Sequence, residues 1–100
     1  MTNTKETANL GKWGRLHYDY LYRNKRTVIN AMWLKGTLQA YLEQFDADAQ
    51  DSFEKLVKRT AEVENVTEEL KASDQMEWVR QMNNIRNRVE EFIISEYVYQ

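Results

Sequence analysis

The sequence contains no cysteine and no proline, and it has one histidine and three glycines among its 100 residues. The lack of cysteine excludes disulfides, thiol nucleophiles and cysteine-ligated zinc, and it is compatible with a reducing compartment. The lack of proline means that only Gly11, Gly14 and Gly36 can interrupt a helix readily. No stretch approaches the roughly 18 apolar residues of a membrane span, and the first residues lack the apolar core of a signal peptide. We therefore expect a cytoplasmic protein that makes no membrane contact.

Hydrophobic residues make up 42% of the chain and aromatic residues 12%, which at this length predicts one packed domain. We expect a flexible polar leader over residues 1–10 and a single helical domain over residues 11–100. Charge is sorted along the chain: the net charge is +5 over residues 1–42, −7 over residues 43–77 and zero over residues 78–100. A basic, aromatic-rich end beside an acidic middle is typical of a protein that meets a partner.

Apolar residues recur at helical spacing, and no segment alternates as a strand would. We predict an all-α fold, a compact antiparallel bundle of four to five helices with short connections. The predicted helices cover residues 13–35, 37–45, 47–65, 67–72 and 74–97. Gly36 suits the left-handed position after the first helix, and Asp46 offers an N-cap for the third.

The last predicted helix has the clearest apolar face, with residues at spacings of four, three, four and three. That face comprises Trp78, Met82, Ile85, Val89 and Phe92. A second apolar line, formed by Met76, Ile94 and Val98, either closes the C-terminus onto the core or forms a homodimer or partner surface. Arg86 borders the main face, where burial would require an acidic or carbonyl partner.

Catalytic and metal-binding motifs are lacking. His17 sits among aromatic residues on a helix, and we predict that it is packed or half-exposed rather than catalytic. The acidic run from Asp46 to Asp51 resembles a calcium loop, but such a loop needs glycine at its sixth position and glutamate at its twelfth. Those positions hold Asp51 and Val57. The segment Gly11-Lys12-Trp13-Gly14 lacks the third glycine and the lysine that phosphate-binding loops carry at fixed positions. It suggests a hinge at the start of the first helix. We predict a non-enzymatic protein with no catalytic residue, metal or cofactor.

Basic and aromatic residues interleave over residues 13–26, as they do where guanidinium groups meet phosphates and rings stack on bases or on a protein. The alternative is that the tyrosines cover the core while the cations are merely solvated. The predicted partner or nucleic-acid contacts here are Arg15, Tyr18, Tyr22, Arg23, Lys25 and Arg26, of which Arg15, Arg23 and Arg26 are expected on one outer face.

An acidic face on the third predicted helix and its flanks offers another contact surface, because basic grooves of nucleic-acid enzymes attract negative charge from any source. It comprises Asp48, Asp51, Glu62, Glu64, Glu68 and Glu69. The simpler interpretation of such a run is a solvated surface.

Several blocks resemble the TnpV family, small proteins encoded on bacterial transposons and conjugative elements. The matching blocks are Trp13-Gly14-Arg15, Tyr41-Leu42, Val66 to Ala72 and Met76 to Arg86. The resemblance implies a mobile-element origin in a Gram-positive host and implies no mechanism. Within the last block, Asn83 and Asn84 do not belong to the predicted apolar face. They are therefore further candidates for specific hydrogen bonds to a partner.

Three function classes follow. The first is a non-catalytic interaction protein that binds and modulates a nucleic-acid-acting protein; its sharpest version, an anti-CRISPR-like inhibitor of a Cas nuclease, rests on the needs of mobile elements. The second is a nucleic-acid-binding accessory protein in transposition, transfer or their regulation. The third, an enzyme acting on RNA or protein, requires a convergent polar pocket that the sequence does not indicate.

Overall fold

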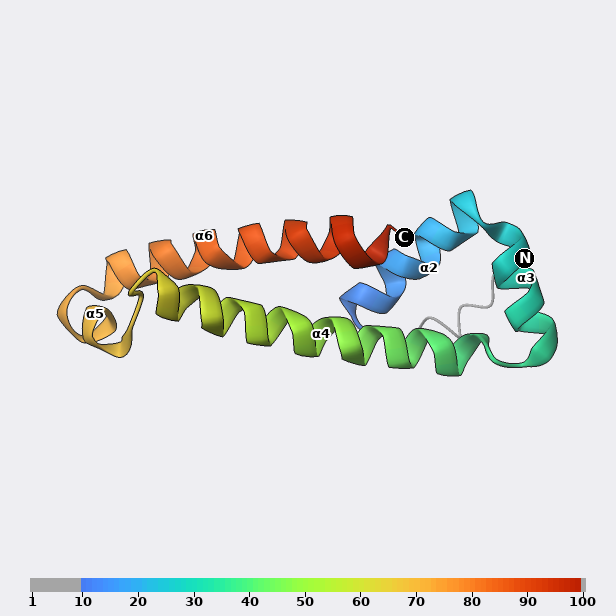
Figure 1. Cartoon of the computed structure of the whole chain (residues 1–100), viewed down its shortest axis with the longest axis horizontal. Helices are drawn as coiled ribbons and strands as arrows, with labels where there is room; N and C mark the ends of the chain where they lie inside the picture. The colour runs from blue at the N-terminus through green and yellow to red at the C-terminus, as the bar shows by residue number, and fades with distance from the viewer. Residues whose placement is uncertain (1–9, 100) are drawn as a thin grey trace.

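The computed structural model describes residues 10–99, and within that range the chain is helical with no strand (Figure 1). The elements are α2 (Lys12–Asn24), α3 (Arg26–Lys35), α4 (Leu38–Val63), α5 (Glu68–Ser73), α6 (Gln75–Ile93) and the π-helix η1 (Ile94–Val98). The predicted all-α class is confirmed. None of the described helices combines the length and the apolar character needed to cross a membrane.

The helices form an elongated molecule around α4. α6 lies antiparallel along the second half of α4, and α2 packs against the first half near η1 (Figure 1). α5 lies at one end of the molecule and α3 at the other. The principal extents are 55 × 21 × 17 Å, and the radius of gyration is 17.0 Å. A compact domain of this length would have a radius of gyration of about 13 Å, so the bundle is longer and thinner than the compact one predicted.

The predicted break between residues 45 and 47 is wrong, because α4 is continuous for 26 residues. Asp46 does not cap α4; its Oδ1 accepts a hydrogen bond from the backbone N–H of Gly14 at 2.8 Å. Gly14 is in the first turn of α2, whose own N-cap, Gly11, has no side chain to offer. A carboxylate there satisfies an unpaired amide and interacts favourably with the helix dipole. Asp46 therefore caps a helix, but a different one from that predicted.

Gly11 and Gly14 allow α2 to approach α4 closely, and they are not the hinge that we predicted. A Cβ at Gly11 would lie 2.7 Å from Asp46 Oδ2. A Cβ at Gly14 would lie 3.3 Å from the carbonyl oxygen of Leu42. A side chain at Gly11 would require the Asp46 carboxylate to move, and one at Gly14 would require its neighbours on α4 to shift by a few tenths of an ångström.

Asp46→Ala is expected to lower the free energy of unfolding by about 1–2 kcal/mol, the usual cost of losing a capping acceptor. Asp48→Ala is the matched control, since that exposed carboxylate accepts only from Gln44 of its own helix. Its effect should stay within about 0.5 kcal/mol. Urea denaturation of both variants measures the difference, and equal losses would contradict the role given to Asp46.

The predicted helix over residues 13–35 is broken at Lys25, where φ is −141° and ψ is 54°. The Lys25 N–H still donates to Leu21 O at 2.7 Å, while its carbonyl accepts from Val28 N at 3.0 Å and begins α3. The change of direction lets Ile29 join a buried cluster with Leu38. A straight helix would carry Ile29 away from that cluster. The expected single face of Arg15, Arg23 and Arg26 is therefore split between two helices.

Both α2 and α4 contribute residues to two apolar clusters. The first contains buried Trp13, Ala49, Val57, Ala61, Val66, Ile85, Val89, Ile93 and Val98. The second contains Leu10, Tyr18, Leu21, Ile29, Leu38 and Leu42. Leu10 is thus part of the core, although we placed it in the leader. Residues 1–9 of that predicted leader lie outside the described range.

The buried face of α6 follows steps of four through Ile85, Val89 and Ile93, and then a step of five to Val98. The π-helix supplies the extra residue, since Tyr99 N donates to Ile94 O, five residues earlier, at 3.1 Å. Our placement of Phe92 on the core face is wrong, because its side chain is 49% exposed.

The three residues of the second apolar line do not form one exposed surface. Met76 is 83% exposed, Val98 is completely buried, and Ile94 packs against the first cluster. Val98 thus closes the C-terminal segment onto the core, which was the first of our two interpretations. A homodimer surface built from all three residues is excluded by the burial of Val98.

Candidate partner-binding site

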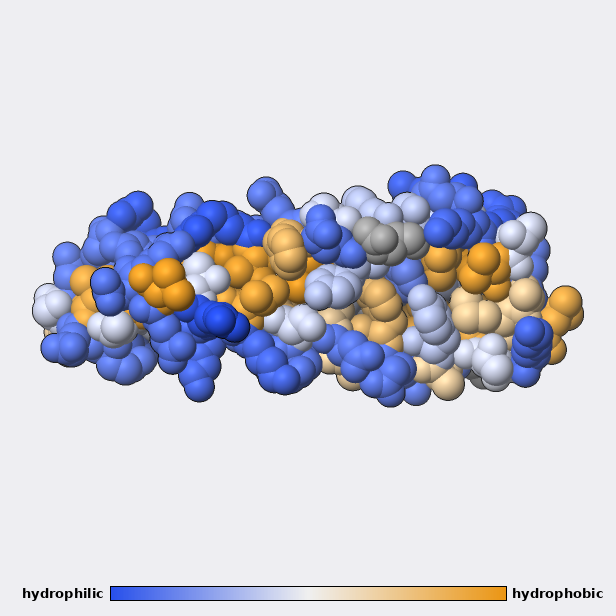
Figure 2. All heavy atoms as spheres, viewed as in Figure 1, coloured by the Kyte–Doolittle hydropathy of each residue, from blue (hydrophilic) through white to orange (hydrophobic). Residues whose placement is uncertain are grey.

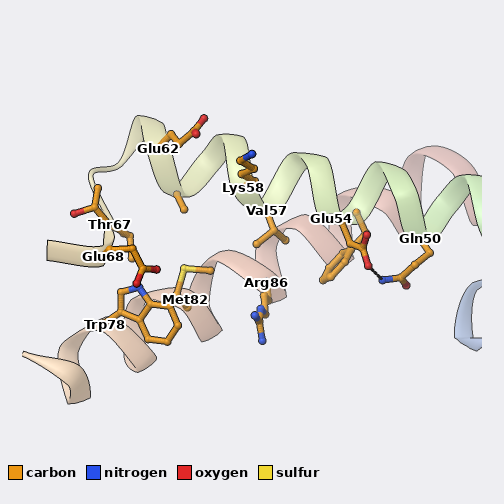
Figure 3. A pocket seen from close by; sticks show the side chains of 13 residues that line it. Gln50, Glu54, Val57, Lys58, Glu62, Thr67, Glu68, Trp78, Met82 and Arg86 are labelled. Carbon is orange, nitrogen blue, oxygen red and sulfur yellow. Dashed lines mark hydrogen bonds between the residues drawn. The ribbon is translucent and has the colours of Figure 1, made fainter. Parts of the chain in front are cut away.

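An open groove of about 750 Å³ lies between α4 and α6 and is here called the α4–α6 groove (Figure 3). Its apolar floor consists of Phe53, Val57, Ala61, Val66, Trp78 and Met82. Its charged rim consists of Glu54, Lys58, Glu62, Glu68 and Arg86. Figure 2, viewed as in Figure 1, shows that apolar surface also lies between hydrophilic bands toward the α5 end of the molecule.

The floor of the groove is the outer side of the first core cluster. Val57, Ala61 and Val66 are buried, whereas Trp78 and Met82 are half-buried and pack against the cluster. The ammonium group of Lys71 lies 4.8 Å from the centroid of the Trp78 ring, which holds the indole at the end of the groove. The cluster is therefore partly open to solvent along one side of the α4–α6 pair, at half-buried Phe53, Trp78 and Met82.

The rim is mixed in charge and only partly neutralised within the protein. Gln50 Nε2 donates to Glu54 Oε2 at 3.0 Å. In the described part of the chain, Glu62, Glu68 and Arg86 have no ion-pair partner. Arg86, which we expected to need one because of burial, is exposed. These side chains can meet charges on a ligand without first breaking an internal ion pair.

Glu64, the residue that follows α4, pairs with Arg88 of α6. Arg88 donates two hydrogen bonds to the Glu64 carboxylate, at 2.8 and 2.7 Å. These bonds lower the pKa of Glu64. The end of α4 is thus joined to α6 by a bidentate pair, the geometry in which guanidinium and carboxylate match best.

Three of the predicted basic contacts, Arg23, Lys25 and Arg26, lie at the break between α2 and α3, whereas Arg15 lies near the start of α2. Arg15, Arg23, Lys25 and Arg26 are exposed. The guanidinium carbon of Arg26 lies 4.0 Å from the centroid of the Tyr22 ring and partly covers it. Tyr18 belongs to the second cluster and is only 8% exposed.

Two tyrosines that were not among the predicted contacts lie beside Arg23. Tyr20 and Tyr99 form a stacked pair with ring centroids 5.4 Å apart. Together with Arg23 and Asn24 they line a hollow of about 410 Å³. The signal that could have found Tyr99 is the tyrosine-rich C-terminal end, although its pairing with α2 depends on the tertiary fold.

Asn83 and Asn84 are exposed on α6 and are not brought to the basic residues of α3. Asn84 Oδ1 accepts a hydrogen bond from Arg88 Nε at 2.9 Å. The acidic face is likewise divided, since Asp51 pairs with Lys55 and Glu64 pairs with Arg88. The predicted contacts therefore form separate groups rather than one site.

His17 is buried with both ring nitrogens hydrogen-bonded. Nδ1 lies 2.8 Å from Val98 O, and Nε2 lies 2.7 Å from the Tyr41 hydroxyl. A carbonyl can only accept, so Nδ1 carries the proton and, in the neutral ring, Nε2 accepts from Tyr41. The ring stacks on Phe45 at 3.9 Å between centroids. Burial lowers the pKa of His17, partly opposed by the bond to Val98. His17 is therefore a neutral structural residue that joins α2, α4 and η1.

The lowered pKa of His17 makes stability depend on pH. Below pH 6.5 the unfolded state binds a proton more readily than the folded state, so stability is complete above pH 6.5 and falls as pH decreases toward the folded pKa. One proton gives a slope of at most about 1.4 kcal/mol per pH unit. Carboxylates with lowered pKa, such as Glu77 at about 2, stay ionised between pH 5 and 7.

Denaturant unfolding between pH 5 and 7 tests this dependence. His17→Gln removes the titrating group and should flatten the profile, because the sequence has no other histidine. An unchanged slope in that variant would show that another group carries the effect.

Comparison with known proteins gives one family. The family model described as transposon-encoded protein TnpV matches residues 1–98. No curated protein and no solved structure matches the chain significantly.

Proposed function

Because this chain belongs to the TnpV family of transposon-encoded proteins, we propose that it is a non-enzymatic interaction protein of a mobile element. In this proposal it binds and modulates a protein that acts on nucleic acid. The observation that supports the proposal most directly is the α4–α6 groove, where half-buried Phe53, Trp78 and Met82 leave apolar surface open between charged side chains. Apolar surface bounded by polar residues marks protein-binding sites in soluble proteins.

The arrangement of titratable groups supports a non-enzymatic role. The only histidine is buried and neutral, and both of its nitrogens are engaged. The carboxylates of the groove rim, those of Glu54, Glu62 and Glu68, are exposed and do not lie in an enclosed apolar pocket of the kind that supports acid–base catalysis. The described residues contain no group of three or more His, Asp or Glu side chains arranged to hold a metal ion.

Capture from a host lysate, with and without nuclease digestion, tests the proposal. A protein partner should remain bound after digestion, and Met82→Lys should reduce its capture about tenfold or more by placing a charge on the groove floor. Met76→Lys is the matched control, because Met76 is on the same helix and 83% exposed. Release of all captured protein by the nuclease, or equal loss in both variants, would contradict the proposal.

The sharpest form of the proposal is an anti-CRISPR-like inhibitor of a Cas nuclease. A mobile element that enters a new host meets nuclease defence, and a helical protein without catalytic groups can act only by occupying a surface of its target. Purified protein added to a guide-loaded Cas nuclease should then slow DNA cleavage, and Met82→Lys should not. Full cleavage at saturating protein would reject this form while leaving other protein partners open.

Direct nucleic-acid binding is the second candidate, as an accessory function in transposition, transfer or their regulation. It is favoured by the grouping of Arg23, Lys25 and Arg26 with the stacked pair of half-buried Tyr20 and exposed Tyr99. In fluorescence anisotropy with labelled DNA or RNA, affinity should fall steeply with salt, by a log–log slope of about −0.7 to −0.9 per phosphate contact. Changing the three cations to glutamate should abolish binding. No binding at low salt would eliminate this candidate.

A further inference from the structure

The fold already places one basic amphipathic helix beside α4 and the C-terminal end of α6. α2 packs on α4 and on η1, and it buries Trp13 in the first cluster. On the flank of α2, Lys12 Nζ pairs with Glu90 Oε1 of α6 at 2.5 Å. α2 thus shows how a third helix packs on the α4–α6 pair. Its aromatic side chain, Trp13, points into the core, and its cation, Lys12, pairs with a carboxylate of α6.

The α4–α6 groove continues from the place where α2 begins. Trp13 Nε1 donates to Gln50 Oε1 at 2.8 Å, and the Trp13 ring lies 5.5 Å from that of Phe53. Gln50 and Phe53 are also the first residues of the groove lining. Beyond them the two helices run on to α5 with an apolar floor and no third helix among the described residues (Figure 3).

The dimensions of the groove suit a short helix. Along α4 the lining runs from Gln50 to Glu62, which at 1.5 Å per residue is about 18 Å, or about 12 residues of a partner helix. Helices pack with axes about 8–10 Å apart, so a partner can occupy the open side as α2 does further along.

The rim indicates the charge of the partner. It carries three carboxylates, those of Glu54, Glu62 and Glu68, and two cations, Lys58 and Arg86. The wider segment from residue 43 to residue 77 carries a net charge of −7. A cationic flank is therefore favoured over an acidic one, as on α2 itself.

Residues 1–9 are poorly suited to cover the groove. Their sequence, Met1 to Asn9, contains one large apolar side chain, that of Met1. A floor of six apolar residues needs several apolar side chains spaced along one helical face.

We propose that the α4–α6 groove binds the apolar face of an amphipathic helix of about three turns, flanked by lysine or arginine, from a partner protein. This inference rests on the proposed function and specifies the chemistry of the partner. The helix extends the arrangement that α2 begins, and its cations lie against Glu54, Glu62 and Glu68.

Two synthetic model helices test the proposal, one with leucines on one face and lysine flanks, the other with glutamate in place of lysine. Isothermal titration should show that the lysine peptide binds about tenfold more tightly, as expected for about three exposed ion pairs. The rim variant Glu54→Lys/Glu62→Lys/Glu68→Lys should reverse this preference. A control with the same charge change at exposed positions outside the groove, Glu43→Lys/Glu91→Lys/Glu96→Lys, should keep it.

Several results would overturn the inference. Preference of the unmodified protein for the glutamate peptide would do so, while leaving a protein-binding groove intact. Self-association that Met82→Lys abolishes would assign the groove to a second copy of the chain. If neither peptide binds while Met82→Lys still loses a captured host protein, the partner presents a different structure and only this inference fails.

Discussion

Trp13→Ala is expected to lower the free energy of unfolding by about 3–5 kcal/mol, the usual cost of deleting a buried tryptophan. The indole is only 2% exposed and packs in the first cluster. Its Nε1 donates to Gln50, and its ring contacts that of Phe53. A domain of this size has a total stability of about 5–15 kcal/mol, so the variant should be largely unfolded at moderate urea concentrations.

Trp33→Ala provides the matched control. Trp33 is 41% exposed on α3 and belongs to neither buried cluster. Its loss should cost about 1 kcal/mol or less. Denaturation followed by circular dichroism compares the two variants without relying on the deleted fluorophore. Equal destabilisation would mean that α3 contributes far more to the core than its burial indicates.

Deletion of Ser95 is expected to leave stability within about 1 kcal/mol of the starting protein, whereas deletion of Asn87 should cost at least about 4 kcal/mol. Removing Ser95 from η1 turns the step of five between Ile93 and Val98 into a step of four. An ordinary α-helix then carries Val98 to the same face. The Val98 carbonyl stays within reach of His17.

Deletion of Asn87 tests the opposite case. It rotates everything that follows by one residue, so that Glu90, Ile94 and Tyr99 take the positions of buried Val89, Ile93 and Val98. Urea unfolding distinguishes the two deletions. A severe loss on deleting Ser95 would mean that the π-helix itself is required, beyond its effect on register.

Helix ends with a local chemical signal were predictable from the sequence. Gly36 adopts φ of 73° after α3, as its lack of a Cβ allows. Asp74 Oδ1 accepts from Glu77 N at 3.1 Å and caps α6. In both cases the residue and its partner lie within a few positions of each other, so the outcome does not depend on the rest of the fold.

The helix ends were predicted wrongly where the capping residue bonds to a distant part of the chain, or where the sequence carries no capping or helix-breaking residue. Asp46 carries the same signal as Asp74, but its carboxylate bonds to α2, 32 residues earlier. No glycine or proline near Lys25 predicts a break in the helix. The break is favoured because it brings Ile29 to the second cluster. The five-residue spacing between Ile93 and Val98 likewise depends on the tertiary fold, because it brings Val98 to the first cluster.

The groove could not be predicted, because its floor looks like core in the sequence. Trp78 and Met82 have the spacing of buried residues, and they do pack on the first cluster. Whether a further helix covers them is a property of the whole arrangement. The exposure of the predicted contacts depends on their chemistry. The cations Arg23 and Lys25 are exposed, whereas the apolar ring of Tyr18 is buried in the core.

The unbroken length of α4 has a geometric consequence. α4 is a single helix of 26 residues, about 39 Å from end to end. The groove lies along its C-terminal half, and the bend at Lys25 lies near its N-terminal end. The spacing between these regions cannot change unless backbone hydrogen bonds of α4 are broken. A partner bound in the groove is therefore held at a fixed distance from the basic residues near Lys25.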